Sequence, residues 1–467
     1  MGGPLINPSL PDRGNTAWRA AIGALVVALV VLFAGVRAYV IFRLDEQNLQ
    51  EPPSSFSAPV LLPGASGAQV FVLSGRWQTY RGPRRLNPSP ERVELHVDLW
   101  AFDAVDARHR WHRRVLSERN GAMSDKVLLG IDGETVWIYA NGLRALRASD
   151  GAPIADAARI ETRNPQLAGR LVGEARYYGF DHNGLYLTDA DARSWRIDAR
   201  DFGARPVETS AVAARADVAR PAYFQSSATS SFQSRGMNIG SDWLGVLTDD
   251  EAAKLGSPAV VPGAEPGERR GAAAWLLDSL NTPDNLDAPG LKRYRLWRAR
   301  IDQVSRAPAD WPKEMPDNWG VRPRYSGYAV LAEAPDFLAA GLLDRGEGNL
   351  PIWLREPDSV LILHRDRLGE EGRLQLSRVS GPAGRVVWTA TLPLSVLQAV
   401  MGDEKSLTVF GREYVPEVIR PDASRRGDPY HDASEQIVSI DLASGKLGSY
   451  NLTVDGRAAL LEDAGVK

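Results

Sequence analysis

Cysteine is missing from all 467 residues of the chain, and lysine is scarce, with 7 Lys against 48 Arg. The lack of cysteine excludes disulfide bonds, thiolate metal sites, a cysteine nucleophile and a lipid-modified N-terminal cysteine. The formal net charge is only −3, so no overall positive field attracts nucleic acid, and we expect no nucleic-acid partner. The preference for Arg, with abundant Ala, Gly and Pro, is typical of a GC-rich bacterial genome.

Sequence motifs of common catalytic sites are missing as well. The chain has no Gly-x-Ser-x-Gly elbow, no Walker phosphate loop and no His-Glu-x-x-His pair. His364-Arg365-Asp366 matches the triplet of a kinase catalytic loop, but no Gly-rich loop or Asp-Phe-Gly accompanies it, and it continues a predicted strand. We therefore assign no catalytic residue, no cofactor-binding residue, no metal ligand and no cofactor.

Two groups of histidine and carboxylate residues were considered as metal ligands. Asp428, His431 and Asp432 lie in a polar stretch and offer two carboxylates and an imidazole to a hard metal ion, although a solvated turn is the simpler interpretation. His109 and His112 are three positions apart in a region of β pattern, so we predict that they point to opposite faces and share no metal.

The chain has one long apolar run. Residues 20–36 carry no charge, and as a helix they would extend about 25 Å. Ten of these 17 residues are Ile, Leu, Val or Phe. Their favourable free energy of membrane insertion outweighs the cost of inserting Arg37 at the end of the run. We predict a transmembrane signal anchor over residues 18–42, after a short tail of residues 1–17. A buried core helix and a cleaved signal peptide are the alternatives.

Flanking charge does not decide the orientation of this anchor, because two arginines precede the run and two follow it: Arg13, Arg19, Arg37 and Arg43. A short tail followed by one early span is the layout of a signal anchor with an exported domain. We therefore expect a single-pass protein of the bacterial inner membrane with most of the chain in the periplasm. Residues 43–67 are rich in Pro, Ser and Gly and are interpreted as a tether.

From residue 68 onwards, alternating strands and tight turns recur along the chain. Residues 99–111, LWAFDAVDARHRW, contain a strand, a turn after Asp103, and Trp111 eight residues later. The same order recurs at 374–388 and 436–450, and more weakly at 142–154 and 193–207. Further hairpins are predicted upstream of these units, through Asp132-Gly133 and Asn183-Gly184 and over 359–379 and 406–415. The hairpins join into four-stranded units that must stack to bury both faces.

These units resemble the outer strands of quinoprotein-type (PQQ-like) β-propeller blades, except that Ala107 stands where that pattern has glycine. The resemblance implies an all-β fold over residues 68–467, a single β-propeller with seven or eight four-stranded blades. An irregular pair of β-sandwiches is the alternative. On the propeller interpretation, five tryptophans are assigned to packing between blades: Trp100, Trp111, Trp137, Trp195 and Trp388.

Residues 204–290 match no blade and are interpreted as an insertion rich in loops and helices. Short helices are predicted from Thr248 to Gly256, over 271–280 and over 335–345. Long loops on one face of a propeller favour a docking surface for a protein partner, and a merely tolerated insertion is the alternative. The arginine-rich stretches WHRR and SRR are interpreted as surface charge, with a patch for an anionic partner as the alternative.

The function expected from these features is a membrane-anchored, non-enzymatic propeller that serves as a protein-interaction scaffold at the inner membrane. The alternative is a quinone-dependent dehydrogenase of the PQQ propeller type, which the blade resemblance implies. The overall layout also resembles a group of membrane-anchored bacterial propeller proteins, and that resemblance implies no activity.

Overall fold

The computed structural model describes most of the chain after residue 52, and the statements below concern the described residues. These are Leu25, Ala28, 30–32, 53–55, 57, 59–62, 68–80, 92–122, 125–181, 183–207, 232–256, 283, 286–305, 322–344, 352–354, 358–368, 372–381, 383–403, 405–414 and 433–463.

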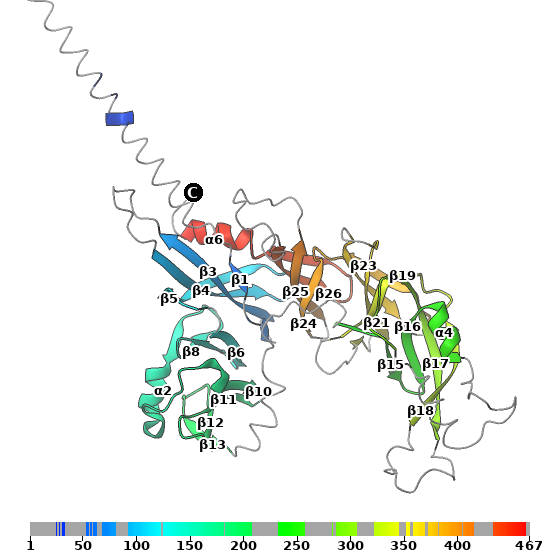
Figure 1. Cartoon of the computed structure of the whole chain (residues 1–467), viewed down its shortest axis with the longest axis horizontal. Coiled ribbons are helices and arrows are strands. Elements are labelled where there is room, and N and C mark those ends of the chain that lie inside the picture. The colour runs from blue at the N-terminus through cyan, green and yellow to red at the C-terminus, as the bar shows by residue number, and fades with distance from the viewer. Residues whose placement is uncertain are drawn as a thin grey trace, which may run out of the picture.

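The protein is all-β, and within the sheets most strands pair antiparallel with the next one along the chain (Figure 1). The first sheet contains β1 (Ser54–Ser55), β2 (Val60–Leu62), β3 (Gln69–Tyr80), β4 (Arg92–Asp103) and β5 (His109–Arg119). The second sheet contains β6 (Lys126–Asp132), β7 (Thr135–Ala140), β8 (Leu143–Arg147) and β9 (Pro153–Asp156). The third sheet contains β10 (Tyr178–Asp181), β11 (Gly184–Thr188), β12 (Ser194–Ile197) and β13 (Ala204–Val207).

Three further meanders complete the described fold. The fourth sheet contains β15 (Gly236–Ile239), β16 (Asp242–Leu247), β17 (Arg293–Ser305) and β18 (Arg322–Val330). The fifth contains β14 (Gln233–Ser234), β19 (Phe337–Leu343), β20 (Trp353–Leu354), β21 (Ser359–Arg365), β22 (Leu374–Ser380) and β23 (Val386–Thr391). β17 also pairs with β19, which joins the fourth and fifth sheets into one ten-stranded sheet. The sixth contains β24 (Val396–Gly402), β25 (Ser406–Tyr414), β26 (Ala433–Asp441) and β27 (Leu447–Asn451).

Helices are short and lie between or after the sheets. The segment between β9 and β10 forms α2 (Ala157–Arg163), η1 (Pro165–Leu167) and η2 (Ala175–Tyr177). α4 (Asp249–Gly256) follows β16, and α6 (Asp455–Asp463) follows β27. The predicted start of α4 is confirmed, because Glu251 N–H donates to Thr248 Oγ1 at 3.2 Å and Thr248 N–H donates to the Glu251 carboxylate at 2.8 Å.

The last hairpin has the same geometry in five of these sheets. In the first sheet, for example, the Asp103 carbonyl accepts a hydrogen bond from the Ala107 N–H, and the Asp103 N–H donates to the Arg108 carbonyl. The same pair of backbone hydrogen bonds, to the residues four and five positions later, closes the other four turns. The residue four positions later has a positive φ every time: Ala107, Gly151, Phe202, Gly384 and Gly445. Glycine adopts this conformation most easily, yet Ala107 adopts it too, with φ of 57°. The shared hydrogen bonds and the shared positive φ confirm the predicted repeat.

A tryptophan of one sheet packs on the turn glycine of the next. A Cβ placed on Gly151 would come within 2.5 Å of the Trp111 ring, and one on Gly445 within 2.7 Å of the Trp388 ring. Trp388 also donates from Nε1 to the Leu442 carbonyl at 3.0 Å. These contacts fix the register between neighbouring sheets.

Five hydrophobic clusters hold the sheets together, each shared by two neighbours. Through these clusters the sheets follow one another in space in the order third, second, first, sixth, fifth and fourth. Within the described residues no such cluster joins the third sheet to the fourth, and in Figure 1 these two stand at the ends of an arc of sheets. All five tryptophans assigned to packing between blades belong to these clusters, which confirms that prediction: Trp100, Trp111, Trp137, Trp195 and Trp388.

Several expectations differ from the structure. The described strands form six meanders, so the count of seven or eight blades stays a prediction. The predicted insertion at 204–290 contributes β13 to β16 to these meanders. The predicted helix over 335–345 is wrong, because residues 337–343 form β19, whose uniformly apolar sequence is buried between β17 and β21. A short apolar run of this kind fits a buried strand as well as a helix. The predicted tether at 43–67 contributes β1 and β2, both paired with β3.

The predicted anchor lies largely outside the described residues, as does the predicted helix over 271–280. Leu25, Ala28 and residues 30–32 are helical, and the side chains of Leu25 and residues 30–32 are exposed. No helix within the part of the chain that is described is both long and apolar enough to cross a membrane. The anchor therefore stays a prediction.

The contact between turn glycine and tryptophan gives a test of the sheet stacking. We expect Gly151→Ala to lower the free energy of unfolding by about 2–4 kcal/mol, because it adds a left-handed alanine and drives a methyl group into Trp111. Gly133→Ala is the control, since Gly133 has φ of 58° with nothing within 4 Å of its Cβ position. Equal losses for both variants in denaturant titrations would show that the tryptophan contact is not important.

Candidate functional site

A basic groove of about 490 Å³ lies between the first and second sheets. It is bordered by Arg113, Arg114 and Val115 of β5, by Arg144 and Leu146 of β8, by residues 153–156 of β9, and by Arg159 of α2. β5 and β9 are the outer strands of their sheets, each paired on one side only within the described strands. The groove thus combines four arginines with one carboxylate, Asp156, and several apolar side chains.

Three of the four arginines take part in no ion pair among the described residues. Among the described residues, no carboxylate forms an ion pair with Arg113, Arg144 or Arg159. Asp156 is exposed and places one negative charge at the groove, and its Oδ1 caps α2 by accepting a hydrogen bond from the Arg159 N–H at 2.9 Å. The groove therefore keeps a local excess of positive charge although the whole chain is slightly acidic.

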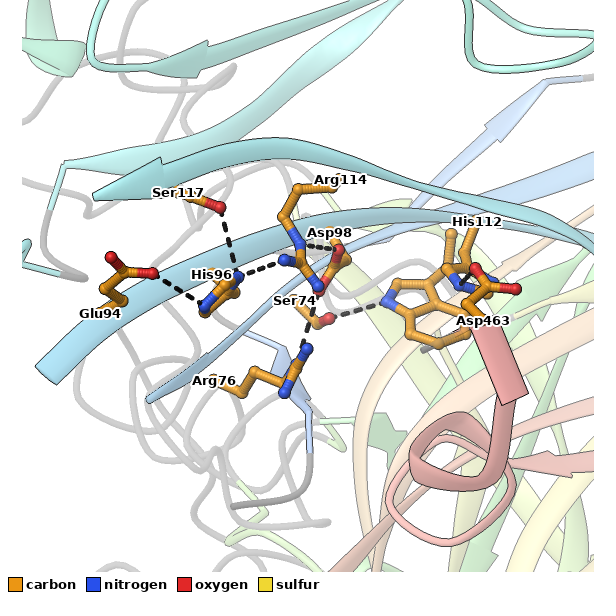
Figure 2. Close-up of polar contacts among 10 residues, drawn as sticks. Ser74, Arg76, Glu94, His96, Asp98, His112, Arg114, Ser117 and Asp463 are labelled. Carbon is orange, nitrogen blue, oxygen red and sulfur yellow. Dashed lines mark hydrogen bonds and ion pairs between the residues drawn. The ribbon is translucent and has the colours of Figure 1, made fainter. Parts of the chain in front are cut away.

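The fourth arginine, Arg114, connects the groove to a buried polar network in the first sheet. Arg114 Nε donates to Asp98 Oδ1 at 2.6 Å, and its Nη1 contacts His96 Nδ1. On the other side, the Asp98 carboxylate lies 3.9 Å from Arg76 Nε. Figure 2 shows Asp98 between the two guanidinium groups. One buried carboxylate therefore contacts two arginines, and its pairing with Arg114 holds that side chain in place at the edge of the groove.

His96 is enclosed by the same network. Its Nε2 lies 3.6 Å from a Glu94 carboxylate oxygen and its Nδ1 lies 3.2 Å from Ser117 Oγ (Figure 2). Burial, together with the positive charges of Arg114 and Arg76, lowers the pKa of His96 to about 3. His96 is therefore neutral at physiological pH and serves as a hydrogen-bonding group rather than as a third positive charge.

The sequence of β4 accounts for this placement. Glu94, His96 and Asp98 alternate with apolar residues, so strand geometry places all three on one face. An irregularity in the β4–β5 ladder then pairs Asp98 with Arg114 and Val97 with Leu116, which leaves Val115 as an extra residue. The alternation of titratable residues was visible in the sequence, but nothing local indicated which arginines would face them.

The prediction that His109 and His112 point to opposite faces is wrong. A second irregularity in the same ladder pairs Ala101 with Trp111 and Phe102 with His109, and the extra residue returns both histidines to one face. His112 Nδ1 lies 3.3 Å from His109 Nε2, and His112 Nε2 lies 2.9 Å from an Asp463 oxygen of α6. The pair therefore belongs to the junction of the first sheet with the C-terminal helix.

The other residues considered in the sequence occupy ordinary places or lie outside the described residues. His364 continues β21 as predicted, with Nε2 at 2.8 Å from Ser377 Oγ. Asp428, His431 and Asp432 lie outside the described residues, as does the SRR stretch. Within the described ranges, no three or more His, Asp or Glu side chains are grouped so that they could hold a metal ion. The arginines of WHRR, by contrast, line the groove.

Comparison with known proteins gives no family. No family model matches the chain, and no curated protein matches it. Among solved structures, BamB from Moraxella catarrhalis is 11% identical, with 77% of this chain and 97% of that chain covered and a TM-score of 0.18. A mutant of the Synechocystis apocarotenoid oxygenase is 10% identical, with 86% and 62% covered and a TM-score of 0.21. Its cobalt-substituted form is 8% identical over the same shares, with a TM-score of 0.20.

Superpositions with such low TM-scores carry no argument about fold or function, and this chain spans only 62% of the oxygenase chains. The four-stranded antiparallel sheets are themselves consistent with a β-propeller-like fold. The resemblance to quinoprotein-type blades stays a prediction.

Asp98 provides a test of the buried network. We expect Asp98→Asn to lower the free energy of unfolding by about 3–5 kcal/mol, because it removes the buried negative charge that both Arg76 and Arg114 contact. Asp191→Asn is the matched control, since Asp191 pairs with Arg170 on the surface, where an ion pair contributes about 1 kcal/mol or less. If both variants unfold at the same denaturant concentration, Asp98 does not organise the network.

His364 predicts part of the pH dependence of stability. Burial lowers its pKa to about 4, so as pH falls below about 6.5 the unfolded chain binds a proton that the folded chain does not. This histidine alone should therefore reduce the free energy of unfolding by about 2 kcal/mol between pH 7 and pH 5. We expect His364→Gln to show a smaller difference between these two pH values. An unchanged difference in denaturant titrations would contradict the prediction.

Proposed function

We propose that this protein is a scaffold anchored in the bacterial inner membrane that holds a protein partner on the periplasmic side. The observation that carries this proposal is the groove between the first and second sheets, where Arg113, Arg144 and Arg159 form no ion pair with a described carboxylate. A partner that supplies the opposite charge would bind there. The apolar run at residues 18–42 supports the anchoring part of the proposal.

The construction of the groove suits docking. Its walls belong to two sheets whose shared core includes Phe71, Leu99, Val136 and Ile138, all fully buried. Arg114 is held by the Asp98 network, and α2 is capped by Asp156. A surface that is fixed before binding loses little conformational entropy when a partner arrives. The groove therefore resembles a preformed docking site in its physical properties.

The proposal is tested by photocrosslinking of the full chain in its own cell. With a photoreactive residue in place of Ile154, which lines the groove, we expect discrete protein adducts. The control position is Val387, which is exposed on β23, the outer strand of the fifth sheet. Absence of protein adducts at Ile154, or the same adducts at both positions, would contradict the scaffold. So would a reproducible rise in melting temperature with pyrroloquinoline quinone and Ca²⁺, accompanied by dye reduction with an alcohol or a sugar.

A further inference from the structure

We infer that the segment bound in this groove is an acidic stretch of polypeptide with apolar residues between its carboxylates. The inference rests on the proposed function, because it requires that a protein partner binds at this groove. Its first argument is charge. Three guanidinium groups border the groove without an ion pair to any described carboxylate, and the one carboxylate in the lining, Asp156, can offset at most one of these charges.

The second argument is the way the arginines are held. Arg144 Nε donates to the Ala140 carbonyl at 3.1 Å, and Arg159 Nη1 donates to the Ile154 carbonyl at 2.8 Å. The Arg159 guanidinium also lies 5.7 Å from the centre of the Phe202 ring. Each guanidinium has five N–H groups, so these contacts leave most donors of both arginines for a ligand. A planar arginine held in this way matches the two oxygens of a carboxylate.

The third argument is the apolar lining of the groove, which favours a polypeptide over other kinds of anion. Val115, Leu146 and residues 153–155 lie beside the arginines, and the volume of about 490 Å³ is that of a typical ligand site. A peptide can place carboxylates on the arginines and apolar side chains on this lining at the same time. A lipid bilayer presents its headgroups as a broad surface, which fits a recess between two sheets poorly.

The experiment uses the full chain, purified in a neutral detergent, and a fluorescein-labelled peptide of twelve residues with alternating glutamate and leucine. Fluorescence anisotropy should show saturable binding that weakens as salt is raised, because the contacts are ionic. The same peptide with glutamine in place of glutamate should bind at least tenfold more weakly. Equal binding of the two peptides would overturn the inference without recourse to any variant.

Two matched triple variants locate the binding. Arg113→Gln/Arg144→Gln/Arg159→Gln removes the groove charges and should weaken binding at least tenfold. Arg200→Gln/Arg205→Gln/Arg300→Gln removes the same number of exposed charges from the third and fourth sheets and should bind as the unaltered chain does. A variant with lysine at the three groove positions keeps the charge without the planar fork, and we expect intermediate affinity. An equal loss of affinity for the acidic peptide in the groove variant and the control variant would overturn the inference.

Two further outcomes separate the inference from its rivals. If vesicles of phosphatidylglycerol bind the chain and displace the peptide, while the groove triple loses both, then the groove recognises lipid headgroups and the inference is wrong. If crosslinks at Ile154 persist but the acidic peptide does not bind, a protein partner exists that is not acidic, so this inference fails while the scaffold stands. Absence of crosslinks at Ile154 contradicts the scaffold itself.

Discussion

The structure depends on one constraint, namely that the sheets with a neighbour on each side carry apolar residues on both faces. In β4, Leu95, Val97 and Leu99 are buried against the second sheet, while Trp100 and Phe102 are buried against the sixth. A sheet of this kind is stable only between two neighbours, because either uncovered face would expose a large apolar area to water. Successive four-stranded meanders meet this requirement by stacking one on the next, and the first and last sheets of the chain become neighbours as a consequence.

Stacking also brings the two ends of the described domain together. The Glu435 carboxylate of β26 accepts hydrogen bonds from Ser54 Oγ at 3.1 Å and from the Ser55 N–H at 2.7 Å, and it pairs with Arg412 at 3.2 Å. β1, which carries these serines, pairs with β3 of the first sheet. A buried carboxylate therefore ties the start of the domain to its last sheet, with its charge balanced by one arginine and two neutral donors.

Local sequence was sufficient to predict the parts of the fold that depend on neighbouring residues. The hairpins through Asp132-Gly133 and Asn183-Gly184, the five packing tryptophans and the cap of α4 were all predicted from spacing and turn chemistry. β19 was mistaken for a helix, because an apolar run of seven residues has no period that distinguishes the two. His109 and His112 were placed on opposite faces because the irregularity between them depends on the pairing with β4, which local sequence does not specify.

The groove could not be predicted from the sequence, because it too depends on contacts between segments that are distant in the sequence. Arg113, Arg144 and Arg159 come from three different elements, and only the stacking of the first sheet on the second brings them together. Their meeting beside the outer strands β5 and β9 follows from the fold, since the stacked faces are filled by apolar side chains and charged groups are left at the edges. Three arginines with like charge at one edge repel each other, and no described carboxylate offsets that repulsion by an ion pair. An anionic ligand would supply the opposite charge that these arginines do not receive from a described ion pair, which is the physical reason to regard the groove as a binding site.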